Sequence, residues 1–176
     1  MIYFDNAATA IKREEILKNI LKNKQAFDGN PDSLHTKGRE AKKILEDSRK
    51  EIAKSIGANP KNIIFTSGAT EGNNTIINAF RDSEIITSSI EHDSILNTVN
   101  KDNTVLLNAN KDGIIDLDKL KDVITEETKL VAIMYVNNET GAIQPVKEIG
   151  DYLRDKNIWF HVDSVQAYGH IDIDVD

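Results

Sequence analysis

Three short segments combine side chains and spacings that could bind a ligand or take part in a reaction. The first, residues 66–74, follows an apolar run and includes the hydroxyl side chains of Ser67 and Thr70 on either side of Gly68. Small residues ahead of a predicted helix let backbone N–H groups approach an anion at its positive end, which predicts a phosphate site. An ordinary serine or threonine helix cap would use the same residues, and the lysine of a P-loop is missing.

The other two segments each follow a predicted strand. Residues 136–141 contain Asn137, Asn138 and a glycine, a run that more commonly forms a turn than a binding site. In residues 161–166, period-two alternation sends His161 and Asp163 to the same face. A carboxylate at a strand end can hold a cationic ring nitrogen by a charge-assisted hydrogen bond, so Asp163 is a candidate ligand residue.

Metal and hydrolase chemistry fit the sequence less well. The four histidines, His35, His92, His161 and His170, form no HExxH or paired HxH pattern, and no GxSxG segment supports a serine hydrolase. The absence of cysteine excludes disulfides, thiolate metal sites and a cysteine nucleophile within these residues. His92, which follows a predicted strand, either stacks on a planar ligand or is an ordinary solvated or core histidine.

The elements that must position these residues follow from periodicity. Helices are predicted at residues 13–27, 33–56, 69–80, 93–100, 117–126 and 146–156. Strands are predicted at residues 63–66, 84–87, 104–107, 130–136 and 158–162. Strands that alternate with helices predict an α/β fold with a mainly parallel sheet, and such sheets bind ligands at the carboxyl ends of their strands.

Composition limits the partners. The 22 basic and 29 acidic residues give a net charge of -7, which disfavours broad binding to nucleic acid or to an anionic membrane surface. The sequence shows neither a secretory signal nor an apolar run long enough to cross a bilayer, so we expect a cytoplasmic protein.

Six motifs occur along the chain in a characteristic order. They are Tyr3–Thr9, Asn30–His35, Phe65–Glu71, Glu91–His92, Val136–Gly141 and His161–Gln166. In order and spacing they resemble the motifs of the cysteine desulfurases, which belong to the class V aminotransferase group of enzymes that use pyridoxal 5′-phosphate. The resemblance covers essentially the whole chain.

The resemblance implies a role for each motif. Ala69 and Thr70 would bind the cofactor phosphate, and His92 would stack on the pyridine ring. Asp163 would pair with the protonated ring nitrogen. Two amide side chains would reach the phenolic oxygen or the substrate beside it, namely Asn138 and Gln166. Four residues would border the substrate entrance, namely Asn6, Ala7, Asn30 and His35.

The resemblance also implies an architecture and a reaction. The fold would be fold type I (aspartate aminotransferase-like), with a mostly parallel sheet flanked by helices in a large domain, followed by a smaller domain, in a homodimer. Residues 1–60 would form an N-terminal helical segment, and residues 61–176 the first part of the large domain. The parent reaction would convert L-cysteine to L-alanine and pass persulfide sulfur to an acceptor protein for iron–sulfur cluster or thio-cofactor synthesis.

Three catalytic groups of the family do not occur in the matching motifs. These are the Schiff-base lysine, the persulfide-forming cysteine and the arginine that binds the substrate carboxylate. We therefore expect the N-terminal portion of a cysteine desulfurase, truncated before the lysine and inactive alone. The alternatives are a selenocysteine lyase or another class V enzyme, and a non-catalytic scaffold or complementing half of a split enzyme.

Overall fold

Four parallel strands form the sheet that carries the candidate ligand residues. The computed structural model describes residues 2–24 and 28–175, and the strands are β1 (Glu84–Ser88), β2 (Thr104–Leu107), β3 (Thr128–Met134) and β4 (Trp159–Asp163). Their order across the sheet is β2-β1-β3-β4, and every neighbouring pair is parallel. The predicted α/β fold with a parallel sheet flanked by helices is therefore confirmed.

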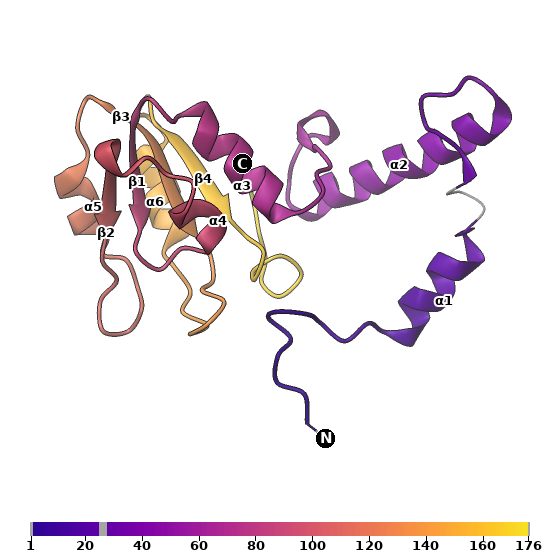
Figure 1. Ribbon diagram of the computed structural model, residues 1–176, viewed down its shortest axis with the longest axis horizontal. Coiled ribbons are helices and arrows are strands. Elements are labelled where there is room, and N and C mark those ends of the chain that lie inside the picture. Colours follow the sequence, from indigo (N-terminus) through magenta and orange to yellow (C-terminus); the bar gives the residue numbers. More distant parts are fainter. Residues whose placement is uncertain (1, 25–27, 176) are drawn as a thin grey trace. The chain divides into compact units, whose positions relative to one another are not determined.

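Helices cover both faces of this sheet, as Figure 1 shows. Alternate residues of β1 and β3 enter different cores: Ile85 and Leu130 pack with α3 (Ala69–Ala79) and α4 (Asp93–Leu96), whereas Ile86 and Val131 pack with α5 (Leu117–Val123) and α6 (Val146–Leu153). Both central strands are thus apolar on each face, which explains their near-continuous hydrophobic sequence.

The chain divides into two compact units, Thr66–Ile171 and Met1–Phe65 with Asp172–Asp176. We call these the α/β unit and the N-terminal unit. The N-terminal unit contains α1 (Glu14–Lys22), α2 (Thr36–Ser55) and the 3-10 helix η2 (Pro60–Asn62). The α/β unit also contains the 3-10 helix η3 (Lys101–Asn103).

Helix α2 begins and ends with specific caps. The His35 side chain accepts a hydrogen bond from the backbone N–H of Gly38, at 3.3 Å. At the other end Gly57 takes a positive φ of 71°, and the N–H of Ala58 donates to the carbonyl of Ala53. This is a Schellman motif, which favours glycine because the left-handed conformation strains other residues.

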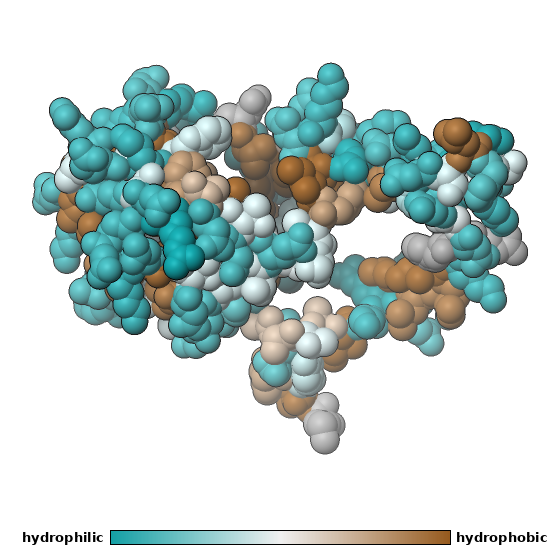
Figure 2. Space-filling model, turned by 45° about the horizontal axis from the view of Figure 1, so that its top comes forward, coloured by the Kyte–Doolittle hydropathy of each residue, from teal (hydrophilic) through white to brown (hydrophobic). Residues whose placement is uncertain are grey.

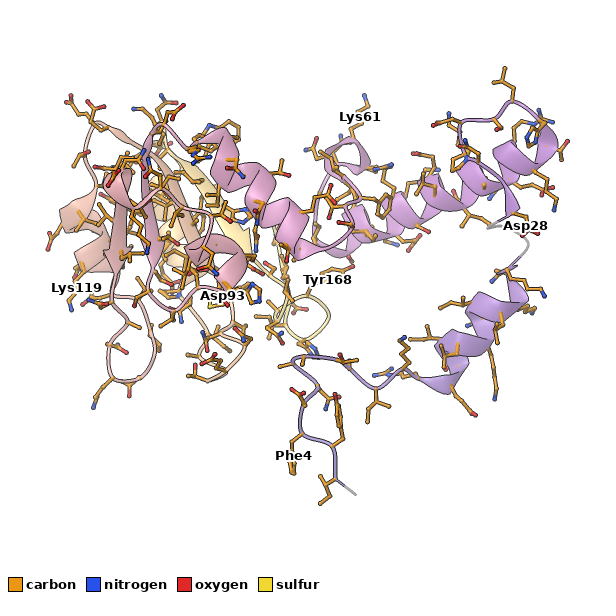
Figure 3. All side chains as sticks on the ribbon, viewed as in Figure 1. Phe4, Asp28, Lys61, Asp93, Lys119 and Tyr168 are labelled. Atoms are coloured by element: carbon orange, nitrogen blue, oxygen red, sulfur yellow. The ribbon has the colours of Figure 1, made fainter. Side chains whose placement is uncertain are left out.

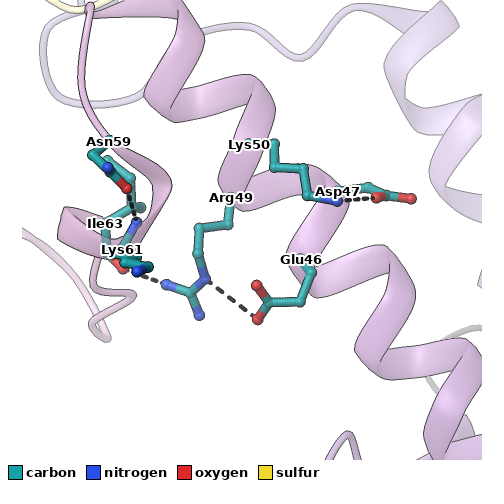
Figure 4. Close-up of polar contacts among 7 residues, drawn as sticks. All are labelled: Glu46, Asp47, Arg49, Lys50, Asn59, Lys61 and Ile63. Atoms are coloured by element: carbon teal, nitrogen blue, oxygen red, sulfur yellow. Dashed lines mark hydrogen bonds and ion pairs between the residues drawn. The ribbon is translucent and has the colours of Figure 1, made fainter.

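Arg49 connects α2 to the chain that follows it (Figure 4). Its guanidinium donates to the carbonyl of Ile63, pairs with Glu46 at 3.4 Å and lies 4.9 Å from the centre of the Phe65 ring. Hydrophobic residues are visible at the molecular surface in Figure 2. Helix α1 has four exposed hydrophobic side chains, namely Ile16, Leu17, Ile20 and Leu21.

Some predicted boundaries differ from the structure. Helix α1 ends at Lys22, and residues 25–27 of the predicted helix lie outside the described residues. Helix α4 ends at Leu96 instead of residue 100, because Asn100 caps η3 by accepting from the N–H of Asp102. Among the residues that the structure describes, no helix is long and apolar enough to span a membrane.

The predicted strand at residues 63–66 is wrong. No described strand pairs with this segment, and Ile64 is 82% exposed, so its β-branched side chains have no sheet to join. Strand propensity reflects packing against neighbouring strands, and without such neighbours the same residues form an irregular connection.

Candidate active site

The carboxyl ends of the strands converge on one edge of the sheet, where the strand order changes direction between β1 and β3. In parallel α/β sheets this reversal opens a crevice for ligands. Three polar segments follow β1, β3 and β4, at residues 89–92, 135–141 and 164–168. Figure 3 labels Asp93 at the start of α4 and Tyr168 in the loop that follows β4.

The N-terminus of α3 offers free backbone donors. Gly68 is the N-cap residue and has no side chain to close the first turn, and no described residue accepts a hydrogen bond from the N–H of Ala69 or Thr70. The N–H and hydroxyl of Ser67 both donate to the carboxylate of Glu71, at 2.7 and 2.6 Å, and these bonds lower the pKa of Glu71. Glu71 is therefore held by Ser67 and leaves the first-turn N–H groups open to an anion.

Asp163 is a buried carboxylate at the end of β4. Its Oδ2 accepts from Asn73 Nδ2 at 2.8 Å, and its Oδ1 accepts from the N–H of Val165 at 3.0 Å. No ion pair among the described residues reaches it. A carboxylate with two neutral donors and no cationic partner suits a cationic ligand atom, because buried charges are otherwise paired.

His161 lies two residues before Asp163, on the same face of β4, as the alternation predicted. Its Nε2 is 2.9 Å from Asn73 Oδ1. Because Asn73 Nδ2 donates to Asp163, Oδ1 must accept the proton of His161 Nε2. Burial lowers the pKa of His161, and the charge of Asp163 offsets part of this effect. His161 is thus a neutral hydrogen-bond donor inside the site.

His92 caps the short helix α4. The N–H of Ser94 donates to His92 Nδ1 at 3.0 Å, and Ser94 Oγ lies 2.8 Å from the same nitrogen. Ser94 Oγ also accepts from Asn73 Nδ2 at 2.9 Å. The ring of His92 is exposed but held in orientation at its Nδ1 edge, which leaves its flat face available for stacking.

Glu91, next to His92, is a second buried carboxyl group. Its Oε1 accepts from Ser88 Oγ at 2.5 Å and from the N–H of Met134 at 3.0 Å, while Oε2 has no partner among the described residues. Burial raises the pKa of Glu91 to about 7, and the charge of Asp163 acts in the same direction. Glu91 therefore holds its proton in weakly acidic solution.

The two neighbouring amides after β3 differ in their surroundings. Asn137 is buried; its Oδ1 accepts from the N–H of Glu139 and of Thr140, and its Nδ2 donates to the carbonyl of Ile90. Asn138 is exposed and has no hydrogen-bond partner among the described residues. Asn137 thus builds the turn, as its sequence suggested, and Asn138 remains available to a ligand.

The remaining candidate residues fall into two groups. Gln166 lies in the α/β unit, three residues after Asp163, and is partly buried. The four candidate entrance residues all belong to the N-terminal unit and are exposed: Asn6, Ala7, Asn30 and His35. Within that unit Asn30 closes a turn by accepting from the N–H of Asp32 at 3.0 Å.

Sequence reasoning missed the residues that join the site together. Asn73 and Ser94 connect Asp163 to His92, and the charge of the same carboxylate acts on Glu91. The one available signal was that Asn73 lies near the end of the predicted phosphate-binding segment, residues 66–74, at a position facing the sheet. A buried asparagine on a helix is unusual, since amides are mostly exposed.

Known proteins are similar to this chain over nearly its whole length. The model of the family described as aminotransferase class-V matches residues 2–176. The cysteine desulfurase IscS of Methanosarcina thermophila is 39% identical, over 99% of this chain and 46% of its own length. The chain thus spans about half the length of the curated relatives it matches.

Solved structures of related proteins have a similar fold. A NifS-like protein from Rickettsia africae superposes with a TM-score of 0.90 at 37% identity, over 99% of this chain and 51% of its own. SspA in complex with cysteine superposes with a TM-score of 0.92 at 32% identity, over 100% of this chain and 54% of its own. Because the family match extends over nearly every residue and the solved relatives share the fold, the chain belongs to the class-V aminotransferase family.

Proposed function

We propose that this chain carries the pyridoxal-phosphate-binding residues of a cysteine desulfurase and forms the N-terminal portion of that enzyme. The complete enzyme would remove sulfur from L-cysteine, leave L-alanine and pass the sulfur to an acceptor protein for iron–sulfur cluster or thio-cofactor synthesis. The observation that carries the proposal is Asp163, a buried carboxylate at the carboxyl edge of the sheet that has no cationic partner among the described residues. The relatives named cysteine desulfurase and the relative in complex with cysteine support the substrate.

The phosphate group fits the N-terminus of α3. The open N–H groups of Ala69 and Thr70 would donate to phosphate oxygens, and the hydroxyl of Thr70 would add a third donor. A side chain added at Gly68 would meet no atom within 4 Å, so the approach to this helix end is open. The helix dipole favours the negative charge at this end.

The ring fits the remaining donors and acceptors. Asp163 would accept the proton of the ring nitrogen, His92 would cover one face of the ring, and Asn138 with Gln166 would bind the phenolic oxygen. When bound, the cofactor would supply an electron sink, since a protonated pyridine ring withdraws electrons from the reacting carbon of the substrate. Asp163 would keep the ring protonated, because an ion pair in a buried place favours the charged form of both groups.

The wider assembly follows from the same proposal. Residues 1–60 would form an N-terminal segment, with Asn6, Ala7, Asn30 and His35 bordering the substrate entrance, and residues 61–176 would form the first part of the cofactor domain. The complete enzyme would be a homodimer. We further propose that these 176 residues do not turn over L-cysteine alone, since they contain no cysteine to carry the persulfide and no serine-glycine-histidine-lysine segment.

Binding of deoxypyridoxine phosphate tests the cofactor site. This analogue keeps the ring nitrogen, phenolic oxygen and phosphate but has no aldehyde, so it cannot react with surface lysines. Isothermal titration should show one site per chain, weakened at least about tenfold by Asp163→Asn, which removes the negative charge facing the ring nitrogen. Asp155→Asn, an exposed aspartate in the same unit, is the charge control.

Two results would overturn the proposal. Absence of analogue binding to the wild-type chain would reject the cofactor site, and equal affinity in Asp163→Asn would reject the role of the carboxylate.

A separate experiment tests the proposed inactivity of the chain. Pyridoxal phosphate and L-cysteine are added, the mixture is reduced with borohydride, and the adducts are mapped. A single stoichiometric lysine adduct together with release of alanine would contradict it.

A further inference from the structure

One buried amide joins three elements beneath the candidate active site. Asn73, on α3, is 4% exposed. Its Nδ2 donates to Asp163 Oδ2 on β4 at 2.8 Å and to Ser94 Oγ on α4 at 2.9 Å, and its Oδ1 accepts from His161 Nε2 on β4 at 2.9 Å. Both amide hydrogens and the carbonyl oxygen are thus used.

We propose that Asn73 is the positioning residue of this site, which holds the carboxylate of Asp163 and the ring of His92 in one fixed relation for the cofactor ring. The inference rests on the proposed function, because those two residues matter together only if one ligand lies between them. Asn73 itself would touch neither cofactor nor substrate.

Its effect on Asp163 is direct. One amide hydrogen of Asn73 and the N–H of Val165 approach different oxygens of the carboxylate, Oδ2 and Oδ1. Two donors on two oxygens fix the plane of the carboxylate, which a single donor would leave free to rotate. Both donors are neutral groups, so they orient the carboxylate and leave it available to a cationic ring nitrogen.

Its effect on His92 passes through Ser94. Because the second amide hydrogen of Asn73 points at Ser94 Oγ, this oxygen acts as an acceptor toward Asn73. The hydroxyl hydrogen of Ser94 is then free to turn to the other neighbour, His92 Nδ1, at 2.8 Å. Asn73 thereby sets the direction of a hydroxyl hydrogen that helps to orient the ring of His92.

The chemistry of the position calls for asparagine. Aspartate offers acceptors only, so its carboxylate would face that of Asp163 where the amide now donates at 2.8 Å. Leucine has a similar shape and no polar atom, and would leave Asp163 and His161 each without one partner. Glutamine carries the same amide one methylene further from the helix and would not fit the three distances.

The neighbouring Asn74 provides a matched control. It also lies on α3 and contacts α4, with Nδ2 donating to the Ser94 carbonyl at 3.0 Å and Oδ1 accepting from Thr98 Oγ1 at 3.1 Å. Asn74 therefore docks the same two helices but makes no hydrogen bond to Asp163 or His161. A variant at Asn74 measures the cost of weakening this helix contact alone.

The first test needs no cofactor. Nitrogen NMR of the histidine rings in the wild-type chain should show His161 protonated at Nε2. Asn73→Asp should raise the pKa of His161 by about one unit or more, because a carboxylate would replace the amide oxygen beside Nε2. Asn74→Asp should shift it by less than half as much. Unchanged titration of His161 in Asn73→Asp would overturn the contact on which the inference stands.

The second test measures binding of deoxypyridoxine phosphate by the wild-type chain, Asn73→Leu and Asn74→Leu. We expect an affinity loss of about tenfold in Asn73→Leu, as for one hydrogen bond to a charged group, and of less than about twofold in Asn74→Leu. If Asn73→Leu does not fold, the isosteric Asn73→Asp takes its place. Equal losses in the two positions would show a structural role only and overturn the inference.

The two proposals fail in different ways. If the wild-type chain does not bind the analogue, the proposed function is rejected. If the wild-type chain binds the analogue and Asn73→Leu binds it equally well, the proposed function stands and Asn73 is not a positioning residue. Loss of affinity confined to Asn73, together with the shifted titration of His161, would support both.

Discussion

Two carboxyl groups at the same edge of the sheet have contrasting surroundings. Asp163 receives a hydrogen bond on each oxygen, whereas Glu91 receives two on Oε1 and none on Oε2 from the described residues. A buried carboxyl oxygen that receives no hydrogen bond disfavours the charged form, and burial raises the pKa of Glu91 to about 7. Glu91 therefore holds its proton in weakly acidic solution, beside the hydrogen-bonded carboxylate of Asp163.

This difference predicts how stability depends on pH. The pKa of Glu91 is raised from 4.5 to about 7 in the folded chain, so the folded state binds the proton more tightly than the unfolded state. Its contribution to stability is complete below about pH 4.5 and is lost as the pH rises to about 7, a change on the order of 3 kcal/mol. The lowered pKa of His161 contributes with the opposite sign, since stability then rises with pH.

Glu91→Gln isolates the contribution of Glu91. Glutamine keeps the acceptor for Ser88 and Met134 and cannot ionise, so the variant should gain stability relative to wild type between pH 5 and pH 8. Urea denaturation at both pH values gives this difference, in which the contribution of His161 cancels. Glu127→Gln, an exposed carboxyl group, controls for the loss of one negative charge. The same pH dependence in wild type and Glu91→Gln would contradict the prediction.

Substitutions at Asn137 and Asn138 should have different effects, the first on the stability of the fold and the second on ligand binding. Asn137→Ala removes the acceptor for two backbone N–H groups and a donor to the Ile90 carbonyl, and should cost about 3 kcal/mol of the free energy of unfolding. Asn138→Ala should change stability by less than about 0.5 kcal/mol but weaken binding of deoxypyridoxine phosphate. Denaturation and titration of both variants check this, and a destabilised Asn138→Ala would refute the assignment.

Single residues that could bind a ligand were named from the sequence, but the residues that hold them in place were not. His92, Asp163 and Thr70 could be named because each stands in a motif at the end of a strand or the start of a helix. The contact of Asn73 with Asp163 joins residues 90 positions apart, and that with Ser94 joins residues 21 apart. No local pattern encodes such a pair, since it arises from the packing of α3 on the sheet.

Among the elements, the start of α3 is both a helix end and the proposed phosphate-binding site. Ala69 is its first residue, where proline is well tolerated because the N–H has no partner within the helix. Ala69→Pro should therefore leave the stability nearly unchanged and remove one of the donors proposed for phosphate.

Titration with two ligands checks this prediction. Deoxypyridoxine phosphate should bind Ala69→Pro about tenfold more weakly than wild type, the size of one hydrogen bond to a charged group. Deoxypyridoxine, which has no phosphate, should bind both proteins alike. A loss of similar size for both ligands would mean that the substitution distorts the ring site instead of the phosphate site.

Element types were predicted well wherever the sequence pattern and the packing agree. The four strands of the sheet and the helices between them were expected at these places, because buried parallel strands are apolar on both faces and the covering helices are amphipathic. The segment 63–66 has similar β-branched residues and forms no strand. Whether such a segment forms a strand depends on a neighbouring strand with which it can pair, and its own sequence does not show whether that neighbour exists.

For the molecule as a whole, the exposed edge of the sheet at β4 should affect how the chains associate. Strand β4 pairs on one side only within the described residues, and its first residue, Trp159, is 69% exposed while its ring lies 6.4 Å from that of Phe80. An exposed edge strand with a large apolar side chain offers unpaired backbone groups to another chain.

We therefore expect the isolated chain to associate through β4. Light scattering at increasing concentration should show species larger than the monomer. Trp159→Lys should reduce them, because pairing with another chain would have to bury the charge of the lysine. Ile143→Lys, which replaces a hydrophobic side chain that is exposed in a loop, is the control and should have little effect. A monodisperse monomer in the wild type would contradict the prediction.

The parallel order β2-β1-β3-β4 also bears on how the molecule reaches its native state. No two neighbouring strands can form a hairpin, and the central pair, β1 and β3, brings together Ile85 and Leu130, which are 45 positions apart. Contacts between distant residues slow folding, because the loop between them must close first. Asp163 lies on the last of the four strands in chain order, so its contacts with α3 can form only after β4 has been synthesised and has docked. Cofactor binding would then occur only in chains whose sheet is fully assembled.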